Sequence, residues 1–318
     1  MSTFRARSYD RLCIDKNFHQ IITIIFCRVL DIRVTNALEI KNLSKKFKSF
    51  KLDNVNLTLP SGCIMGLIGE NGAGKSTLIK LILNILHKDG GTVTILGRDN
   101  TDNIRLTKEE VGVVTDEVGI PECLKAEQVG KIMKHTFRYW DEKAFDNYLV
   151  KLDIPRDKQF KDFSRGTKMK LGIAAALSHK SRLLLLDEAT SGLDPVVRDE
   201  VVDMLSDFTR DEGHSILISS HIVSDLEKLC DYIAFLHKGK LLLCEEKDRL
   251  LEEYCVVRGE KGILAGIDSK AVLNKKETPY SEEGIILRKA APKNAAISPI
   301  SIEELFIYMV KGERSDTL

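Results

Sequence analysis

Short apolar runs alternate along the chain with longer segments in which apolar residues recur every three or four positions. Apolar positions from Leu78 to Leu86 fall on one face of a helix, as do those from Val197 to Phe208. The runs that are short enough to be strands lie at 64–68, 111–114, 183–186 and 215–219. Buried strands that alternate with helices predict an α/β fold with a mainly parallel sheet.

Other segments show the alternation of apolar and polar residues that is typical of half-buried strands. Segments 38–40 and 52–59 predict short strands, and 90–97 predicts a turn followed by a strand, which together suggest an additional antiparallel β part. A hairpin is expected around 238–239. Between these parts the pattern changes to polar and aliphatic stretches with little strand signal. We therefore expect an inserted helical subdomain at about 117–180.

The N-terminal part does not fit this pattern. Residues 1–36 hold one short apolar run, which is followed by Arg28 and Arg33, and no small-residue cleavage site is evident. These features argue against a signal peptide. We interpret the segment as a poorly ordered extension, and the alternative is a short anchoring helix.

The C-terminal part carries a weaker signal. Beyond about Leu250 the periodicity fades until 302–310, where it predicts a final amphipathic helix. The expected organisation is therefore an extension at 1–36, a main domain at 37–250 and a small C-terminal accessory region at 251–318.

Residues 69–76 lie between a predicted strand and a predicted helix and fit the phosphate-binding pattern G-x-x-x-x-G-K-[S/T]. Glycines let successive N–H groups converge on an anion, and the positive end of the next helix adds to the attraction. Lys75 is expected to reach the β- and γ-phosphates, and the Ser76 hydroxyl to ligate Mg²⁺. A glycine-rich turn with a solvated lysine is the less favoured alternative. The residues predicted to bind the nucleotide here are Gly69, Asn71, Gly72, Ala73, Gly74, Lys75, Ser76 and Thr77.

An acidic pair follows the four leucines at 183–186. The carboxyl ends of parallel strands meet at one edge of a sheet, so Asp187 is expected to hold Mg²⁺ opposite Ser76. Glu188 would then polarise the attacking water, because a general base must lie within hydrogen-bond reach of that water. Without the phosphate loop, a solvated surface pair would be an equally good interpretation.

Four further motifs resemble those of ABC-type ATPases. Residues 163–168, Phe-Ser-Arg-Gly-Thr-Lys, resemble the signature loop that is usually written L-S-G-G-Q, and residues 191–194 resemble the D-loop. His221 stands where the family has its switch histidine, 33 residues after Glu188, and Phe47 matches the aromatic residue that stacks on adenine. The resemblance covers residues 37 to about 250, and with it the chain is identified as an ABC ATPase.

The resemblance implies a mechanism and a set of partners. ATP and Mg²⁺ are the expected ligands, and two such domains are expected to pair head to tail. Ser164, Gly166 and Asp194 of one subunit would then contact the ATP that is held by the other, while His221 acts with Glu188 in hydrolysis. Two alternatives stay open, since His221 is also read as a surface or capping histidine and Phe47 as a core residue.

Two departures from the family pattern stand out. Asp116-Glu117 occupies the place of the usual glutamine after the strand at 111–114. A carboxylate can still bind Mg²⁺, so Asp116 is a third candidate metal ligand, but it cannot donate a hydrogen bond to water. Arg165 and Thr167 replace residues of the usual signature. These variants resemble the branch that exports antibiotics and peptides.

Composition narrows the possible partners. The 48 basic and 47 acidic side chains give a net charge of +1, so no global field attracts nucleic acid, and no nucleic-acid partner is expected. The seven cysteines form no C-x-x-C pair, which disfavours zinc and is typical of a reducing cytoplasm. Apolar stretches fall short of the roughly 20 residues that cross a bilayer. A membrane partner would therefore have to hold the protein at the cytoplasmic face.

We therefore expect the ATP-hydrolysing subunit of an ABC transporter that powers a separate integral-membrane permease, with a second ATPase subunit that is identical or different. Export is favoured over import because the accessory region is short. A non-transport ABC ATPase that acts on ribosomes or DNA is the alternative. It is disfavoured because one set of motifs is present and only 89 residues separate Lys75 from Ser164. A GTPase is disfavoured because no N-K-x-D motif follows.

Overall fold

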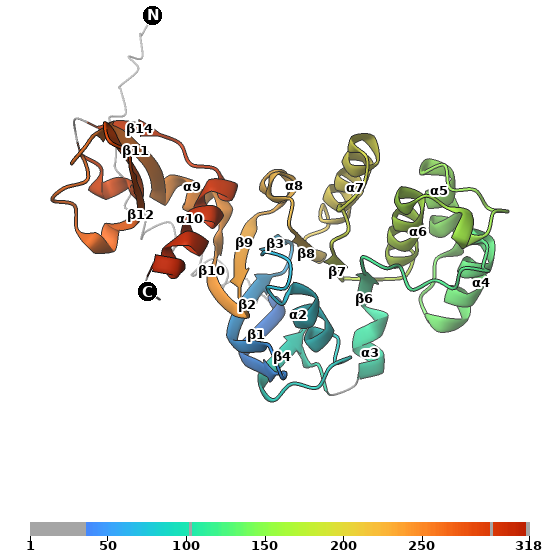
Figure 1. Cartoon of the computed structure of the whole chain (residues 1–318). Coiled ribbons are helices and arrows are strands. Elements are labelled where there is room, and N and C mark those ends of the chain that lie inside the picture. Colours follow the sequence, from blue (N-terminus) through green and yellow to red (C-terminus); the bar gives the residue numbers. More distant parts are fainter. Residues whose placement is uncertain (1–35, 102–103, 293–294, 316–318) are drawn as a thin grey trace, which may run out of the picture. The chain divides into compact units, whose positions relative to one another are not determined.

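A computed structural model describes residues 36–101, 104–292 and 295–315 of the chain (Figure 1). The predicted extension at 1–36 therefore lies outside the described residues, except for its last position. The described part contains three β-sheets. Helices cover the largest sheet, so that the architecture is the predicted α/β class.

The largest sheet has six strands in the order β10-β9-β3-β8-β7-β6. Five of them run parallel, and β10 pairs antiparallel with β9 through the predicted hairpin at 238–239. The strands are β3 (Ile64–Ile68), β6 (Val111–Val114), β7 (Leu183–Asp187), β8 (Ser215–Ser220), β9 (Tyr232–His237) and β10 (Lys240–Glu246). Every residue of β3, β7 and β8 is buried, which explains why these strands read as continuous apolar runs.

A second sheet is antiparallel and has the order β2-β1-β4-β5. Its strands are β1 (Asn36–Lys46), β2 (Lys51–Pro60), β4 (Gly90–Ile95) and β5 (Arg98–Asp99). Helix α2 (Lys75–Ile82) shares one hydrophobic core with this sheet and with β3 and β7. The prediction that this helix continues to Leu86 is wrong. The chain turns at Asn84, whose φ of +53° is left-handed, and Ile85 is 63% exposed.

The segment between β6 and β7 is helical. It contains α4 (Ala126–Thr136), α5 (Glu142–Lys151), the short η1 (Phe160–Asp162) and α6 (Arg165–Leu177). Helix α3 (Ile104–Glu109) precedes β6. A Cβ added at Gly130 would lie 2.8 Å from the Phe145 ring, so glycine permits the close approach of α4 and α5. Helix α6 also packs against β6, and this contact joins the helical segment to the sheet.

Two further helices, α7 (Pro195–Phe208) and α8 (Val223–Leu229), follow β7 and β8. Asp194 and Pro195 begin α7 as predicted, because the Asp194 carboxylate accepts hydrogen bonds from the N–H groups of Val196 and Val197. Arg198 of α7 forms an ion pair with Asp225 of α8 at 3.5 Å, which ties the two helices together.

The C-terminal part contains a third sheet that the sequence did not predict. Its order is β12-β13-β11-β14, and all of its pairings are antiparallel. Its elements are α9 (Lys247–Glu253), β11 (Tyr254–Glu260), η2 (Ser269–Ala271), β12 (Val272–Glu277), β13 (Ser281–Leu287), η3 (Arg288–Ala290), β14 (Ala296–Ser298) and α10 (Ile302–Ser315). The predicted final helix is confirmed as α10. Its Phe306 ring lies 5.2 Å from the Phe235 ring of β9, so α10 packs on the main core.

Candidate functional site

The phosphate loop connects β3 to α2 and relies on glycine at each sharp step. Gly74 caps α2 with a φ of +110°, and Gly72 has a φ of +82°. A Cβ added at Gly69 would lie 2.5 Å from the Leu236 carbonyl oxygen, so no side chain fits there. A Cβ at Gly72 would meet nothing within 4 Å. The loop is therefore braced by the sheet on one side and open on the other.

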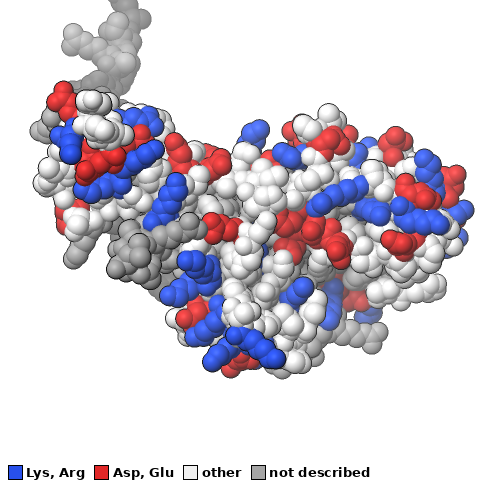
Figure 2. All heavy atoms as spheres, in the orientation of Figure 1, with Lys and Arg blue, Asp and Glu red and all other residues white. Residues whose placement is uncertain are grey.

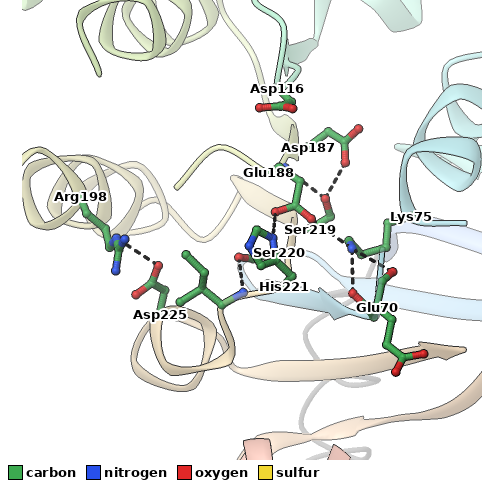
Figure 3. Close-up of polar contacts among 12 residues, drawn as sticks. Glu70, Lys75, Asp116, Asp187, Glu188, Arg198, Ser219, Ser220, His221 and Asp225 are labelled. Atoms are coloured by element: carbon green, nitrogen blue, oxygen red, sulfur yellow. Dashed lines mark hydrogen bonds and ion pairs between the residues drawn. The ribbon is translucent and has the colours of Figure 1, made fainter. Parts of the chain in front are cut away.

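Lys75 follows this loop as the first residue of α2 and is only 6% exposed (Figure 3). Its Nζ donates a hydrogen bond of 2.7 Å to the Gly69 carbonyl and forms a 3.0 Å ion pair with Glu188 Oε1. Glu188 in turn accepts from His221 Nδ1 at 2.7 Å through its other oxygen. Three residues predicted for catalysis and phosphate binding are therefore linked in one chain of contacts.

Glu188 is held in place by the strand beside it. Its backbone N–H donates to the carbonyl and to the hydroxyl of Ser219, and its φ of +55° turns it out of the line of β7. The Ser219 hydroxyl also donates to Asp187 Oδ1 at 2.6 Å. Asp187 and Ser219 are register partners in the parallel strands β7 and β8. Ser219 therefore orients both acids, a role that the sequence analysis missed because nothing local marks this serine.

The other predicted ligands in the phosphate loop lie at its surface or just inside it. Asn71, Gly72 and Ser76 are exposed, Gly74 and Thr77 are half-buried, and Ala73 is buried. Acidic side chains gather in the middle of Figure 2, over the region where β7 and β8 end. The exposed Ser76 hydroxyl and the Asp187 carboxylate are oxygen donors of the kind that Mg²⁺ prefers, so the donor set fits this ion.

Asp116 forms an ion pair with Arg165 of the signature loop, and its role as a metal ligand stays a prediction. In Figure 3 it lies on the same side of the sheet edge as Asp187, and no contact is drawn between them. The sequence analysis named Asp116 and Arg165 as two separate departures, and their pairing across 49 positions was not predicted.

The signature loop begins α6. Ser164 is the N-cap, and its hydroxyl accepts from the Thr167 N–H at 3.1 Å. A Cβ at Gly166 would lie 3.3 Å from Val197 of α7, so this glycine lets the start of α6 approach α7. The described side-chain hydrogen bonds of Ser164 both go to Thr167. None of them reaches the phosphate loop of the same chain.

Phe47 and Asp194 are the remaining residues that were predicted to contact the nucleotide. Phe47 is 37% exposed, its ring centroid is 6.2 Å from that of Phe50, and Lys45 Nζ lies 5.9 Å above it. This exposure disfavours the alternative of simple core packing, and the stacking of Phe47 on an adenine stays a prediction. Asp194 is engaged as the N-cap of α7.

Comparison with known proteins decides the family. Residues 52–191 match the family model described as ABC transporter. The lantibiotic transport ATP-binding protein SrtF of Streptococcus pyogenes is 37% identical over 214 residues, which are 66% of this chain and 91% of SrtF. The bacitracin transport ATP-binding protein BcrA of Enterococcus faecalis is 35% identical over 211 residues, 65% of this chain and 68% of BcrA. The chain belongs to the ABC transporter ATP-binding family.

A solved structure of an ATP-binding subunit of an ABC transporter supports the same assignment. It superposes with a TM-score of 0.62 at 26% identity and covers 67% of this chain and 91% of its own. The expected fold class, the ATPase activity and the resemblance to antibiotic-transport proteins are thereby confirmed. The relatives support the transporter interpretation rather than an ABC ATPase of ribosomes or DNA.

The helices of this ABC ATPase can be checked for a membrane-spanning segment. Within 36–101, 104–292 and 295–315, no helix is long and apolar enough to cross a membrane.

Behind the phosphate loop, the ring of His237 is fully buried, and its Nδ1 lies 3.4 Å from Glu70 Oε2. His237 was also missed by the sequence analysis, since a lone histidine inside a buried strand carries no motif.

Proposed function

We propose that this ATPase uses Mg²⁺ and powers a separate integral-membrane permease from the cytoplasmic face of the membrane. The observation that carries the proposal is the linked set Lys75, Glu188 and His221 at the carboxyl edge of the parallel sheet. Glu188 lies within hydrogen-bond distance of both Lys75 and His221, which supports Lys75 as a phosphate-binding cation, Glu188 as the general base and His221 as the residue that orients the base.

The residues at the carboxyl edge of the parallel sheet would have different roles in ATP hydrolysis. When bound, Mg²⁺ would neutralise part of the negative charge of the phosphate groups. Ser76 and Asp187 are the residues proposed to hold it. Lys75 would exchange its contact with Glu188 for the terminal phosphates, which frees the Glu188 carboxylate to take a proton from the attacking water. His221 would keep that carboxylate oriented through its 2.7 Å hydrogen bond.

We propose that the working unit is a pair of ATPase subunits, either two copies or two related chains. Ser164 and the N-terminus of α6 form an anion-attracting surface, because a helix N-terminus carries free N–H groups and partial positive charge. Ser164, Gly166 and Asp194 are proposed to close over the ATP that Phe47 and the phosphate loop of the second subunit hold.

A groove of about 520 Å³ is the proposed contact for the permease. Its walls are mostly apolar and come from α4, α6 and the loop after β6. Ile85 and Val113 on its rim are 63% and 38% exposed and add to the apolar lining of the groove, and an exposed apolar patch of this kind is typical of a protein contact site. The groove also contains Val118 to Ile120, just after Asp116, so a bound permease would contact the segment next to the site.

The cargo that we propose is a peptide antibiotic or a lipid-like compound, moved outward. The proposal rests on the names of BcrA and SrtF, which are bacitracin and lantibiotic transport proteins. In this proposal the permease contacts the cargo, so the ATPase subunit itself needs no cargo-binding site.

The catalytic assignment is tested by Glu188→Gln. We expect this variant to bind ATP, to hydrolyse it about 10²–10⁴-fold more slowly and to accumulate as an ATP-bound dimer. Steady-state phosphate release and analytical ultracentrifugation measure the two effects. Wild-type turnover in the variant would remove Glu188 as the general base.

The permease assignment is tested by affinity capture from native membranes in mild detergent, with mass spectrometry of the recovered proteins. We expect a polytopic protein at near 1:1 stoichiometry, and its loss from Ile85→Glu. Val150→Glu is the matched control, because Val150 is 74% exposed on α5 and lies outside the groove. Recovery of only ribosomal or DNA-associated proteins would overturn the proposal.

A further inference from the structure

The two residues that depart most clearly from the family pattern contact each other. Arg165 Nη2 donates to Asp116 Oδ1, although the residues are 49 positions apart. Both side chains are about half exposed, at 50% and 52%. Exposed ion pairs contribute little to folding stability, since water competes for both charges. Such a pair can therefore form and break at little cost, which suits a contact that must change during a reaction cycle.

Arg165 also touches the D-loop. A Cβ built on Gly192, whose φ is +68°, would lie 3.1 Å from the central carbon of the Arg165 guanidinium group. The guanidinium group therefore occupies the space where a side chain at 192 would lie. One cation thus bridges the start of α6, the loop after β6 and the segment after β7.

The loop that carries Asp116 is fixed to α6 at a second point. A Cβ at Gly172 would lie 3.2 Å from Val118 and 3.3 Å from Val114, so the helix lies directly on this loop. The ion pair borders a surface pocket of about 710 Å³ that also contains Glu117, Glu122 and Lys168. Asp116 holds the Arg165 charge at the margin of this pocket.

We propose that Asp116 restrains Arg165 in the ATP-free subunit, and that Arg165, once released, contacts the triphosphate held by the second subunit. This inference rests on the head-to-tail pairing proposed above. Asp116 lies on the same side of the sheet edge as Asp187 (Figure 3). When nucleotide binds together with Mg²⁺, the positive charge of the ion can therefore replace that of Arg165 beside Asp116. The state of the subunit's own site would thereby control a cation that acts on its partner's site.

The test measures the ATP concentration that gives half-maximal dimerisation, in the Glu188→Gln background. Asp116→Asn should lower this concentration about threefold, because Arg165 is free before ATP binds. Arg165→Gln should raise it about tenfold, because a charge-assisted contact with phosphate is lost. The double variant should behave like Arg165→Gln alone. An effect of Asp116→Asn that is the same with and without Arg165 would overturn the proposal.

The chain supplies a matched control. Arg156 and Asp146 form an ion pair within the same helical segment, with side chains that are 47% and 48% exposed. Asp146→Asn and Arg156→Gln should leave the midpoint of dimerisation unchanged. A shift as large as that of the Asp116 and Arg165 variants would mean that general surface charge, and not the restraint, sets the midpoint.

A second readout needs neither dimer nor nucleotide. In the ATP-free subunit, Arg165→Gln should increase amide hydrogen exchange at 115–120, while Arg156→Gln should not. Unchanged exchange at 115–120 would contradict the restraint directly. If Glu188→Gln itself fails to dimerise with ATP, the head-to-tail pairing fails, and the exchange measurement still decides whether Arg165 restrains the loop.

Discussion

The catalytic edge, formed by the phosphate loop and the ends of β7 and β8, handles charge very differently from the C-terminal sheet of β11 to β14. At the edge, Lys75 and Asp187 are each only 6% exposed, and Glu188 has a left-handed backbone. In the C-terminal sheet, ion pairs such as Arg258–Glu283 lie at the surface. The apolar side chains of that sheet, including Val256 and Ile285, are turned into the core.

This difference in the burial of charged side chains shows where the chain departs from the packing that favours stability. Buried charges are costly to desolvate, so a fold selected only for stability would not collect them at one edge of its sheet. The C-terminal sheet buries one carboxylate, Glu282, at 4% exposure, but that group accepts hydrogen bonds from the N–H groups of Gly262 and Leu264, and the ion pair Arg258–Glu283 stays at the surface. Substitutions at the edge should therefore mainly change binding and chemistry, and substitutions in the C-terminal part should mainly change stability.

Phe306→Ala gives the largest expected effect. Phe306 is 9% exposed and packs on Phe235, so truncation should lower the free energy of unfolding by about 3–5 kcal/mol. The affinity for ATP, measured by calorimetry below the unfolding transition, should stay at its wild-type value. Ile307→Ala is the control, because Ile307 is 39% exposed and should change stability little. A loss of ATP affinity in the folded Phe306 variant would break the comparison.

Lys75→Ala should produce the opposite result. The lost charge-assisted contacts with phosphate should lower the affinity for ATP by about 10- to 100-fold. Titration calorimetry with ATP and Mg²⁺ measures the change. Lys80→Ala serves as the control, because Lys80 lies exposed on the same helix. Wild-type affinity in the Lys75 variant would show that the contact with Glu188 is structural only.

His179 is a buried ionisable group that lies outside both regions. Its expected effect, on the pH dependence of stability, is smaller than the two effects above. Burial lowers the pKa of His179, and the Glu109 backbone carbonyl opposes this only in part. The folded protein therefore favours the neutral ring. Its contribution to stability is complete above the unfolded pKa of about 6.5 and is lost as pH falls through the lower pKa of the folded state. Chemical unfolding measured from pH 7.5 to 5 should show this decline.

His179→Gln should flatten that part of the pH profile, while turnover per folded molecule stays unchanged. The imidazole ring also stacks on Phe137 at 3.9 Å, so a constant loss of stability at every pH is expected in addition. An unchanged slope in the variant would assign the pH dependence to other groups.

The sequence motifs indicated which segments would meet at the catalytic edge, because the residues of each motif are local, and Lys75 does contact Glu188 there. The phosphate loop and the pair Asp187-Glu188 each lie within a few positions that follow a strand. The contacts of Ser219 and of Arg165 were not predictable, because each joins residues more than 30 positions apart. Such contacts follow from strand order and helix packing, which a single sequence does not display.

The C-terminal sheet escaped prediction for a different reason. Strand β12 contains Lys275 and Lys276 and is half-buried or exposed throughout, so it shows no clear apolar alternation. The end of α2 was misplaced because Asn84 adopts a left-handed turn while the apolar spacing continues. In both cases tertiary packing overrides the local pattern.

The left-handed backbone of Glu188 has an evolutionary consequence. A residue with a Cβ at a φ of +55° carries a conformational cost of about 1–2 kcal/mol, which glycine at the same position would remove. In a lineage released from the need to hydrolyse ATP, replacement of Glu188 by glycine would remove this cost, but it would also leave the buried Lys75 without its 3.0 Å ion-pair partner. The two effects oppose each other, so the backbone strain alone would not drive the loss of this glutamate.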